Sequence, residues 1–147
     1  MVDGRGLAAE IFVSEMERLN GRGLVDEKMA RDFKRLDVWK RSIKLGKSIY
    51  GVVDTFPQKE NYALSSQLRR AVVSVSSNIA EGCGRKTNKD FVNFLYIALG
   101  SLKEVESQLF IAKEFGYLGE DKLSELDGEL NEIGKMLMGF INYISRD

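Results

Sequence analysis

The sequence contains no histidine, one cysteine (Cys83) and one proline (Pro57) among its 147 residues. The absence of histidine excludes Ser-His-Asp and Cys-His catalysis and the common histidine-containing zinc sites. A single cysteine cannot form an internal disulfide, which fits the reducing environment of the cytoplasm. The near absence of proline permits long uninterrupted helices, because proline breaks a helix interior. We therefore predict a cytoplasmic protein that is not an enzyme and that holds no metal or cofactor.

Long hydrophobic runs are also missing. No apolar run approaches the ~20 residues needed to span a bilayer, and the first residues lack the apolar core and cleavage site of a signal peptide. We therefore expect no association with a membrane. The sequence does contain 44% hydrophobic and 30% charged residues, a balance typical of one folded domain with a real core.

Positive and negative charges are equal in number, 22 of each, but they are unevenly distributed along the chain. Residues 31–90 carry 13 Lys and Arg against 6 Asp and Glu, and residues 91–147 carry 5 against 10. This asymmetry predicts a dipolar surface. The alternative is that acidic and basic helices lie next to each other and neutralise one another through weak surface pairs.

Four amphipathic helices are predicted from apolar residues that recur at steps of three and four. They run over about 37–55, from Leu64 to a stop at Gly82 and Gly84, over about 89–114 and over about 120–145. Short connections between them favour an all-α, antiparallel up-down-up-down four-helix bundle over residues 31–147. Apolar residues outside the main stripes of the first, third and fourth helices exceed the needs of one bundle, which favours self-association.

Local signals predict where these helices begin and end. Gly82 and Gly84 follow the last periodic turn of the second helix, where a residue that tolerates positive φ is needed. Gly116 is expected to have the same role after the third helix. Thr87 is predicted to cap the start of the third helix, with Asp90 as the acidic half of a capping box.

Two further patterns predict close helix packing. The second helix has polar residues that also repeat at steps of three and four, which we call the polar seam. We interpret it as a contact with another helix and not as a set of catalytic residues, because no histidine is available to activate a serine. Its members are Gln67, Arg70, Ser74, Ser77 and Glu81. The fourth helix contains three glycines, each of which costs up to ~1 kcal/mol relative to alanine, and this cost suggests close packing against a neighbour or a bend. They are Gly128, Gly134 and Gly139.

Residues 1–30 differ from the rest of the chain. The sequence Gly-Arg-Gly-Leu occurs there twice, at 4–7 and 21–24, and the segment 7–19 carries only a partial apolar stripe. A lone helix of this length is marginal in water unless it docks. We predict an N-terminal extension that is loose or partly helical, or alternatively an arm that docks on a partner subunit.

The stretch from Phe33 to Ile144 closely resembles the family of four-helix bundle proteins encoded in intervening sequences of bacterial 23S ribosomal RNA genes. The residues that carry the resemblance keep their order over roughly three quarters of the chain. They are Phe33, Leu36, Val38, Trp39, Leu64, 66–71 (SQLRRA), 77–82 (SNIAEG), Gly84, Arg85, Phe91, Phe94, Leu95, Ala98, 100–102 (GSL), Glu104, Glu106, Gln108, Leu109, Gly116, Tyr117 and 133–137 (IGKML). The sequence departs from the family pattern at Ser76, where proline is frequent, and at Cys83, where a larger apolar residue is frequent.

The resemblance implies an antiparallel four-helix bundle that assembles into a homopentamer without an established enzymatic activity. A similar bundle is the accessory protein of diversity-generating retroelements, a basic pentamer that binds nucleic acid and its reverse transcriptase. The present chain has no net charge, which matches that role less well. The family name records where the genes were found and is not in itself evidence of RNA binding.

Two functions follow from these observations. The first is binding of structured RNA, or of DNA, through a basic group formed by Arg69, Arg70, Arg85, Lys86 and Lys89. For Arg70, the alternative is an ion pair with Glu81 or with an acidic residue of the fourth helix. The second function is a protein-interaction scaffold, such as an accessory subunit of a reverse transcriptase or of a ribosome-associated partner.

Overall fold

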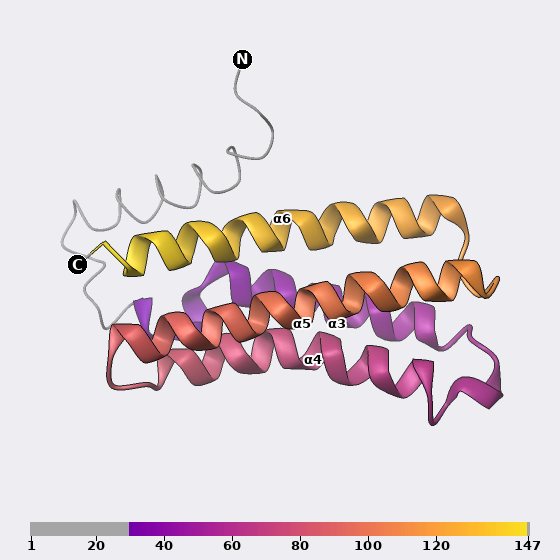
Figure 1. Cartoon of the computed structure of the whole chain (residues 1–147), viewed down its shortest axis with the longest axis horizontal. Coiled ribbons are helices and arrows are strands. Elements are labelled where there is room, and N and C mark those ends of the chain that lie inside the picture. Colours follow the sequence, from indigo (N-terminus) through magenta and orange to yellow (C-terminus); the bar gives the residue numbers. More distant parts are fainter. Residues whose placement is uncertain (1–29, 147) are drawn as a thin grey trace, which may run out of the picture.

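The computed structural model describes residues 30–146, which form four long helices (Figure 1). They are α3 (Asp37–Val53), α4 (Leu64–Cys83), α5 (Asn88–Glu114) and α6 (Glu120–Ile144). Single 3-10 turns, η1 (Phe33–Arg35) and η2 (Gln58–Glu60), precede α3 and α4. The predicted all-α class is confirmed, and the described residues contain no strand. The prediction of an N-terminal extension concerns residues 1–30, of which 1–29 lie outside the described residues.

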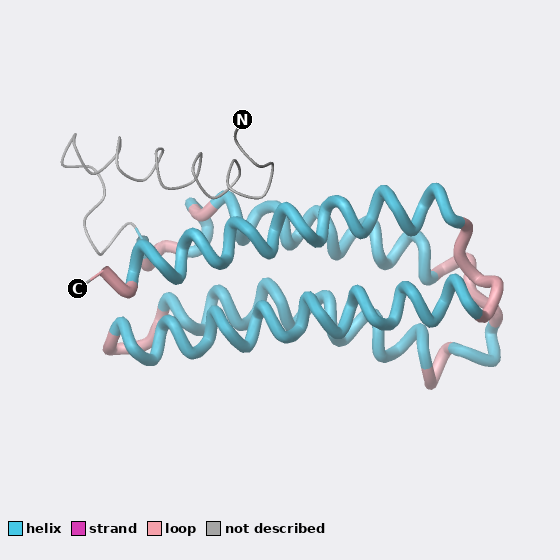
Figure 2. The backbone as a smooth tube through the Cα atoms, turned by 45° about the horizontal axis from the view of Figure 1, so that its top comes forward, coloured by secondary structure: helices cyan, strands magenta, loops and turns pink. Residues whose placement is uncertain are grey.

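Successive helices are neighbours and run in opposite directions, as the turns at alternating ends of the bundle show (Figures 1 and 2). α3 packs on α4, α4 on α5, α5 on α6, and α6 returns to α3. The predicted up-down-up-down bundle is therefore confirmed. α3 and α5 lie diagonally across the bundle from each other, and so do α4 and α6.

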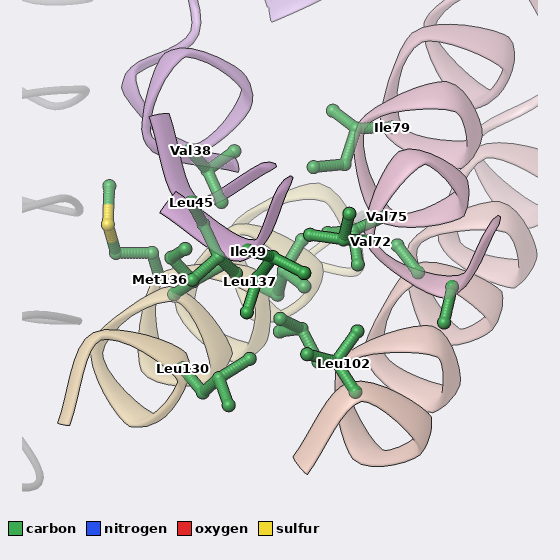
Figure 3. Close-up of a cluster of buried hydrophobic side chains, with 14 of the residues drawn as sticks. Val38, Leu45, Ile49, Val72, Val75, Ile79, Leu102, Leu130, Met136 and Leu137 are labelled. Carbon is green, nitrogen blue, oxygen red and sulfur yellow. The ribbon is translucent and has the colours of Figure 1, made fainter. Parts of the chain in front are cut away.

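The core takes one apolar stripe from every helix, and these are the stripes that the spacing of three and four predicts. Side chains from α3, α4, α5 and α6 meet in Figure 3. Those that are buried and labelled there are Val38, Leu45, Ile49, Val72, Val75, Ile79, Leu102, Leu130, Met136 and Leu137. Each such leucine, isoleucine or valine contributes about 1.5–3 kcal/mol by leaving water. The burial of these side chains is thus the main stabilising term of the bundle.

The helix ends agree with the sequence in two places and differ in one. The Thr87 hydroxyl accepts a hydrogen bond from the Asp90 amide at 3.1 Å, which confirms the predicted cap of α5. Gly116 has φ of +80° and follows α5, also as predicted. The expectation of positive φ at Gly82 and Gly84 is wrong, because Gly82 lies inside α4 and Gly84 has φ of −85°.

Gly82 has a packing role instead. A Cβ at this position would lie 3.0 Å from Phe91 Cδ1 and 3.0 Å from Phe94 Cβ, so the glycine permits the close approach of α5 to α4. The glycines of α6 were also expected to permit close packing against a neighbouring helix. Gly128 has no neighbour within 4 Å of such a Cβ, and Gly134 has only Leu99 Cδ1, at 3.9 Å. For these two glycines, the expectation of close packing against a neighbour is wrong.

This difference predicts opposite effects of one substitution. Gly82→Ala should destabilise the protein by about 1–3 kcal/mol, because the added methyl group overpacks the α4–α5 contact. Gly128→Ala should stabilise it by up to ~1 kcal/mol, because the exposed helix gains propensity without a clash. Urea denaturation followed by far-UV circular dichroism measures both. A stabilised Gly82→Ala variant would contradict the packing role of that glycine.

One ion pair joins the basic and acidic parts of the chain within the bundle. Arg41 Nε and Nη2 of α3 donate to Glu129 Oε1 and Oε2 of α6 at 3.1 and 3.0 Å. A bidentate pair of this kind is stronger than a single contact. Several other pairs lie within one helix and are largely exposed, such as Lys122–Glu125 at 3.4 Å, and these contribute little. At this position, therefore, a basic and an acidic helix lie next to each other and neutralise one another, which is the alternative considered for the uneven charge distribution.

Two carboxyl groups also meet between α5 and α6. Burial, together with the nearby Glu106, raises the pKa of Asp127, whereas the hydrogen bond from Asp127 and the ammonium of Lys103 lower the pKa of Glu106. Lys103 Nζ donates to Glu106 Oε1 at 3.3 Å. Of the two carboxyl groups, Asp127 is therefore the one that keeps a proton to higher pH.

The pair predicts a pH-dependent effect of Asp127→Asn. Because folding raises the Asp127 pKa, the stability it contributes is present at low pH and is lost as the pH rises through the folded-state pKa. Asparagine keeps a donor toward Glu106 and does not ionise. The variant should therefore match the parent at about pH 3 and be more stable by up to ~1 kcal/mol at about pH 7. Thermal denaturation across this range tests the sign, and a stability difference that is independent of pH would contradict it.

Candidate nucleic-acid interface

The five basic residues singled out in the sequence form two separate groups. Arg69 and Arg70 lie in the second turn of α4, whereas Arg85, Lys86 and Lys89 lie in and just after the turn that joins α4 to α5. Sixteen residues of mostly helical chain separate Arg69 from Arg85, which corresponds to roughly 24 Å along the helix axis. The structure therefore does not bring the five residues together.

The second group is joined by an arginine that sequence reasoning missed. Arg31 Nη1 donates to the backbone oxygen of Arg85, and Arg31 Nη2 donates to Asn88 Oδ1 at 2.8 Å. The Arg31 guanidinium also lies over the Phe91 ring, 5.1 Å from its centroid. Arg31, Arg85, Lys86 and Lys89 thus form one basic group at this end of the bundle, which we call the end cluster. Arg31 was not found because it lies 54 residues before Arg85, beyond any local spacing rule.

Arg85 and the two lysines differ in how they are held. Arg85 Nη2 contacts Glu81 Oε1 at 2.7 Å, and its guanidinium stacks on Phe94 with 4.4 Å to the ring centroid. These contacts fix the position of the arginine. Lys86 and Lys89 are exposed, and neither makes an ion pair with any residue from 30 to 146. Lys86 lies in the α4–α5 turn and Lys89 in the first turn of the 27-residue helix α5, where the helix dipole favours negatively charged ligands.

Arg69 and Arg70 line a shallow groove between α3 and α4, which we call the α3–α4 groove. It has a volume of about 470 Å³, and its other lining residues are Tyr50, Ser66, Val73, Ser74 and Ser77. Arg69 contacts Asp54 Oδ1 at 3.8 Å and lies over the Tyr50 ring, 6.0 Å from its centroid. Tyr50 and Val73 expose 41% and 46% of their surface. The groove therefore combines cationic and apolar surface.

Arg70 does not form either of the ion pairs that were considered for it. It is exposed and has no ion pair in the described part of the chain. Glu81 is engaged by Arg85 instead. No acidic residue of α6 is within reach, because α6 lies diagonally across the bundle from α4. The prediction of an intramolecular ion pair for Arg70 is therefore wrong, and the Arg70 guanidinium faces solvent.

The comparison with protein-family models identifies the chain. Residues 34–139 match the model of the 23S rRNA-intervening sequence protein family. This match covers more than half of the chain, from η1 to the last turns of α6. The chain belongs to this family.

One solved structure supports the assignment. It is the crystal structure of a protein of unknown function from the S23 ribosomal protein family of Bacteroides thetaiotaomicron VPI-5482. The two chains share 25% sequence identity and superpose with a TM-score of 0.66, over 71% of this chain and 97% of the other. No curated protein matches the sequence.

The polar seam of this 23S rRNA-intervening sequence protein is a helix contact at Ser74 and Gln67, whereas its other members, Arg70, Ser77 and Glu81, are exposed. Ser101 Oγ of α5 donates to Ser74 Oγ of α4 at 2.9 Å, and Gln108 Nε2 approaches Gln67 Oε1 at 3.4 Å. These bonds satisfy polar atoms between two packed helices. The departure from the family pattern at Ser76 does not bend α4, because the Ser76 hydroxyl bonds the Val73 carbonyl at 3.1 Å within a continuous helix.

Cys83, the other departure, is a buried thiol. Burial raises its pKa to about 12, an effect that outweighs the opposing charge of Arg31. The thiol therefore stays protonated and unreactive near neutral pH. Within residues 30–146 no three acidic, cysteine or histidine side chains are grouped to hold a metal ion. No helix of the described chain is long and apolar enough to cross a membrane.

Proposed function

We propose that this 23S rRNA-intervening sequence protein is a non-enzymatic, cytoplasmic homopentamer that binds structured RNA through the end cluster. The observation that carries the proposal is the exposure of Lys86 and Lys89 without ion pairs among the described residues, beside Arg31 and Arg85. Unpaired ammonium groups on one surface can contact phosphates and release their counterions. Arg85, held by Glu81 and Phe94, and Arg31, held by Asn88, define the rigid part of that surface.

Assembly is supported by two different apolar faces. The outer face of α5 exposes large hydrophobic side chains, as does the side of the bundle formed by α3 and α4. On α5 they are Tyr96, Ile97, Phe110 and Ile111, with Phe115 directly after its last residue, and on α3 and α4 they are Ile43, Tyr50 and Val73. An interface that pairs two different faces is heterologous, and such interfaces generate closed rings when the rotation closes.

The location of the exposed apolar residues differs from the sequence expectation in one respect. The fourth helix was expected to contribute surplus apolar surface, but Met136 and Ile141 of α6 are buried, and Met138 and Tyr143 are partly buried. None of the large exposed hydrophobic residues in the described chain lies on α6. The faces available for association are therefore those of α3, α4 and α5.

Repetition of the end cluster would compensate for its small size. A ring whose axis runs along the bundles would place five copies of Lys86 and Lys89 on one rim. Several weak phosphate contacts on one RNA then act together, because each later contact forms at a high effective concentration. This mode of binding does not require a basic protein overall, which reconciles the proposal with a net charge of zero.

The proposal is tested by titrating the full-length protein, of mass determined by light scattering, with structured ribosomal RNA at several salt concentrations. We expect a pentamer that binds with an affinity that falls steeply with salt. The slope of log affinity against log salt estimates how many phosphates are contacted. Absence of binding at low salt would overturn the RNA proposal.

A protein-interaction scaffold is the second candidate function. It is favoured by a shallow hollow of about 660 Å³ on the outer face of α5, where Phe110, Ile111 and Phe115 lie beside charged residues. Exposed aromatic residues of this kind commonly anchor protein partners. The partner would be a reverse transcriptase or a ribosome-associated protein. Recovery of such a protein in complex with the parent, and not with a Phe110→Ala variant that remains pentameric, would favour this function.

A further inference from the structure

Two concave surfaces of the bundle differ in charge, and both expose large apolar side chains. The first is the α3–α4 groove, where Arg69 and Arg70 lie beside Tyr50 and Val73. The second is the hollow of about 660 Å³ on the outer face of α5, which we call the α5 hollow. Its apolar residues are Phe110, Ile111 and Phe115, and its charged residues are Lys103, Glu106 and Glu114.

Each surface presents one charged side chain that no other described residue neutralises. Arg70 of the groove and Glu114 of the hollow are both exposed, and neither forms an ion pair with any residue from 30 to 146. The other two charges of the hollow neutralise each other, because Lys103 Nζ contacts Glu106 Oε1 at 3.3 Å. The groove is therefore cationic and the hollow is anionic.

The two surfaces lie at the same end of the bundle, where α4 begins and α5 ends (Figure 1). Two hydrogen bonds fix the register of these antiparallel helices, and they join Ser74 to Ser101 and Gln67 to Gln108. Arg70 is therefore level with Val105 of α5, within the range of residues 103–115 that contains the hollow.

The direction of the side chains brings the two charges closer to one height. A side chain of an α-helix leans toward the amino end of its helix. Arg70 thus leans toward Ser66, which the register places level with Leu109 of α5, and Glu114 leans back toward Phe110. Rotation about an axis along the bundle leaves these heights unchanged. The guanidinium of one copy can therefore meet the carboxylate of the next in a ring around such an axis.

The charge distribution of the whole chain also favours contact between unlike faces. Residues 31–90, which include α3 and α4, carry 13 Lys and Arg against 6 Asp and Glu, whereas residues 91–147 carry 5 against 10. Pairing of two grooves would bring Arg70 against Arg70, and pairing of two hollows would bring Glu114 against Glu114. Like charges that face each other across an interface are unfavourable. A head-to-tail contact avoids both repulsions and can be repeated around a ring.

We propose that the α3–α4 groove of one copy receives the α5 hollow of the next copy, with Arg70 of the first paired to Glu114 of the second. Tyr50 and Val73 then pack against the apolar residues of the hollow. This inference rests on the homopentamer proposed above and names its interface. The end cluster lies at the opposite end of the bundle and stays exposed. The occupant of the hollow is a second copy of this chain and not a different protein.

The test is a charge swap, followed by light scattering of the full-length protein over a dilution series. Arg70→Glu and Glu114→Arg should each raise the concentration at which half of the assembly dissociates by at least about tenfold, because like charges then face each other. The Arg70→Glu/Glu114→Arg double variant should return to within about threefold of the parent, because the pair is restored with its charges exchanged. Lys86→Glu, the same charge change at an exposed residue of the opposite end, is the matched control and should leave this concentration unchanged.

The outcomes separate this inference from the proposal on which it rests. A monomeric parent would overturn the homopentamer, and the inference with it. An oligomeric parent that dissociates at the same concentration as both single variants would overturn only the inference, and would leave the hollow to a different protein. A double variant no more stable as an assembly than the single variants would overturn the pairing of Arg70 with Glu114. Loss of RNA affinity in Arg70→Glu without a change in mass would assign the groove to RNA and overturn the inference.

Discussion

Replacing Lys86 and Lys89 together by glutamate should lower the affinity of the protein for structured RNA by at least about tenfold at ~0.1 M salt. The substitution removes two ammonium groups per protomer that make no ion pair within residues 30–146, and it adds two carboxylates beside Arg85. It should also reduce the salt slope by ~1 for every lysine that contacts a phosphate. Both residues are exposed, so the fold should be retained, and the titration described above measures the effect.

A matched control separates this site from general electrostatics. Lys44 and Lys47 are exposed lysines of α3 that make no ion pair within residues 30–146. The Lys44→Glu/Lys47→Glu variant has the same net charge as the Lys86→Glu/Lys89→Glu variant. We expect it to lose less than about threefold in affinity. Equal losses in the two variants would show that the protein binds RNA by its overall charge and not by the end cluster.

Replacing Phe91 by alanine should lower the free energy of unfolding by about 3–5 kcal/mol. Phe91 exposes 1% of its surface, and its ring packs against Phe140 from the opposite side of the α5–α6 interface. Alanine would leave a cavity in a region where Gly82 already brings α4 close to α5. Chemical denaturation of the parent and the variant gives the difference, which amounts to a large share of the stability of a single domain.

The same substitution connects the core to the end cluster. Arg31 lies over the Phe91 ring, so Phe91→Ala should also weaken RNA binding by the folded variant, because Arg31 loses its support. Tyr62→Ala is the control for stability: Tyr62 is 99% exposed in the segment before α4, and its loss should change the free energy of unfolding by less than ~0.5 kcal/mol. A Phe91→Ala variant as stable as Tyr62→Ala would refute the packing described for α5 and α6.

Much of the fold could be predicted because a helix is a local structure. The step of three and four in apolar residues defines both the helix and the face that it buries, so the core stripes were found without knowledge of their partners. Thr87 and Gly116 were identified for the same reason, since a cap or a left-handed residue acts within a few positions of the chain. Gly82 was misread because its neighbours, Phe91 and Phe94, come from the next helix.

The candidate site was only partly predictable. Arg85, Lys86 and Lys89 are close in sequence around a tight turn, and they remain close in space. Arg69 and Arg70 were grouped with them because both sets lie in one short stretch of sequence, but α4 runs between the sets, rises ~1.5 Å per residue and holds them apart. The burial of Cys83 likewise depends on Ala30 and on the helices around it, and so its raised pKa could not be predicted from the residues next to it in sequence.

By itself, the sequence determined the four helices, their buried faces, their antiparallel order and the family to which the chain belongs. Each of these follows from residue spacing or from motifs within a single segment. Only the tertiary structure decided that Arg31 completes the end cluster, that Arg41 pairs with Glu129, and that a side chain at Gly134 would meet only Leu99. These contacts join residues that are 35 to 88 positions apart. Which residues meet at such separations depends on how the helices pack, and that arrangement is not encoded in the spacing of any one helix.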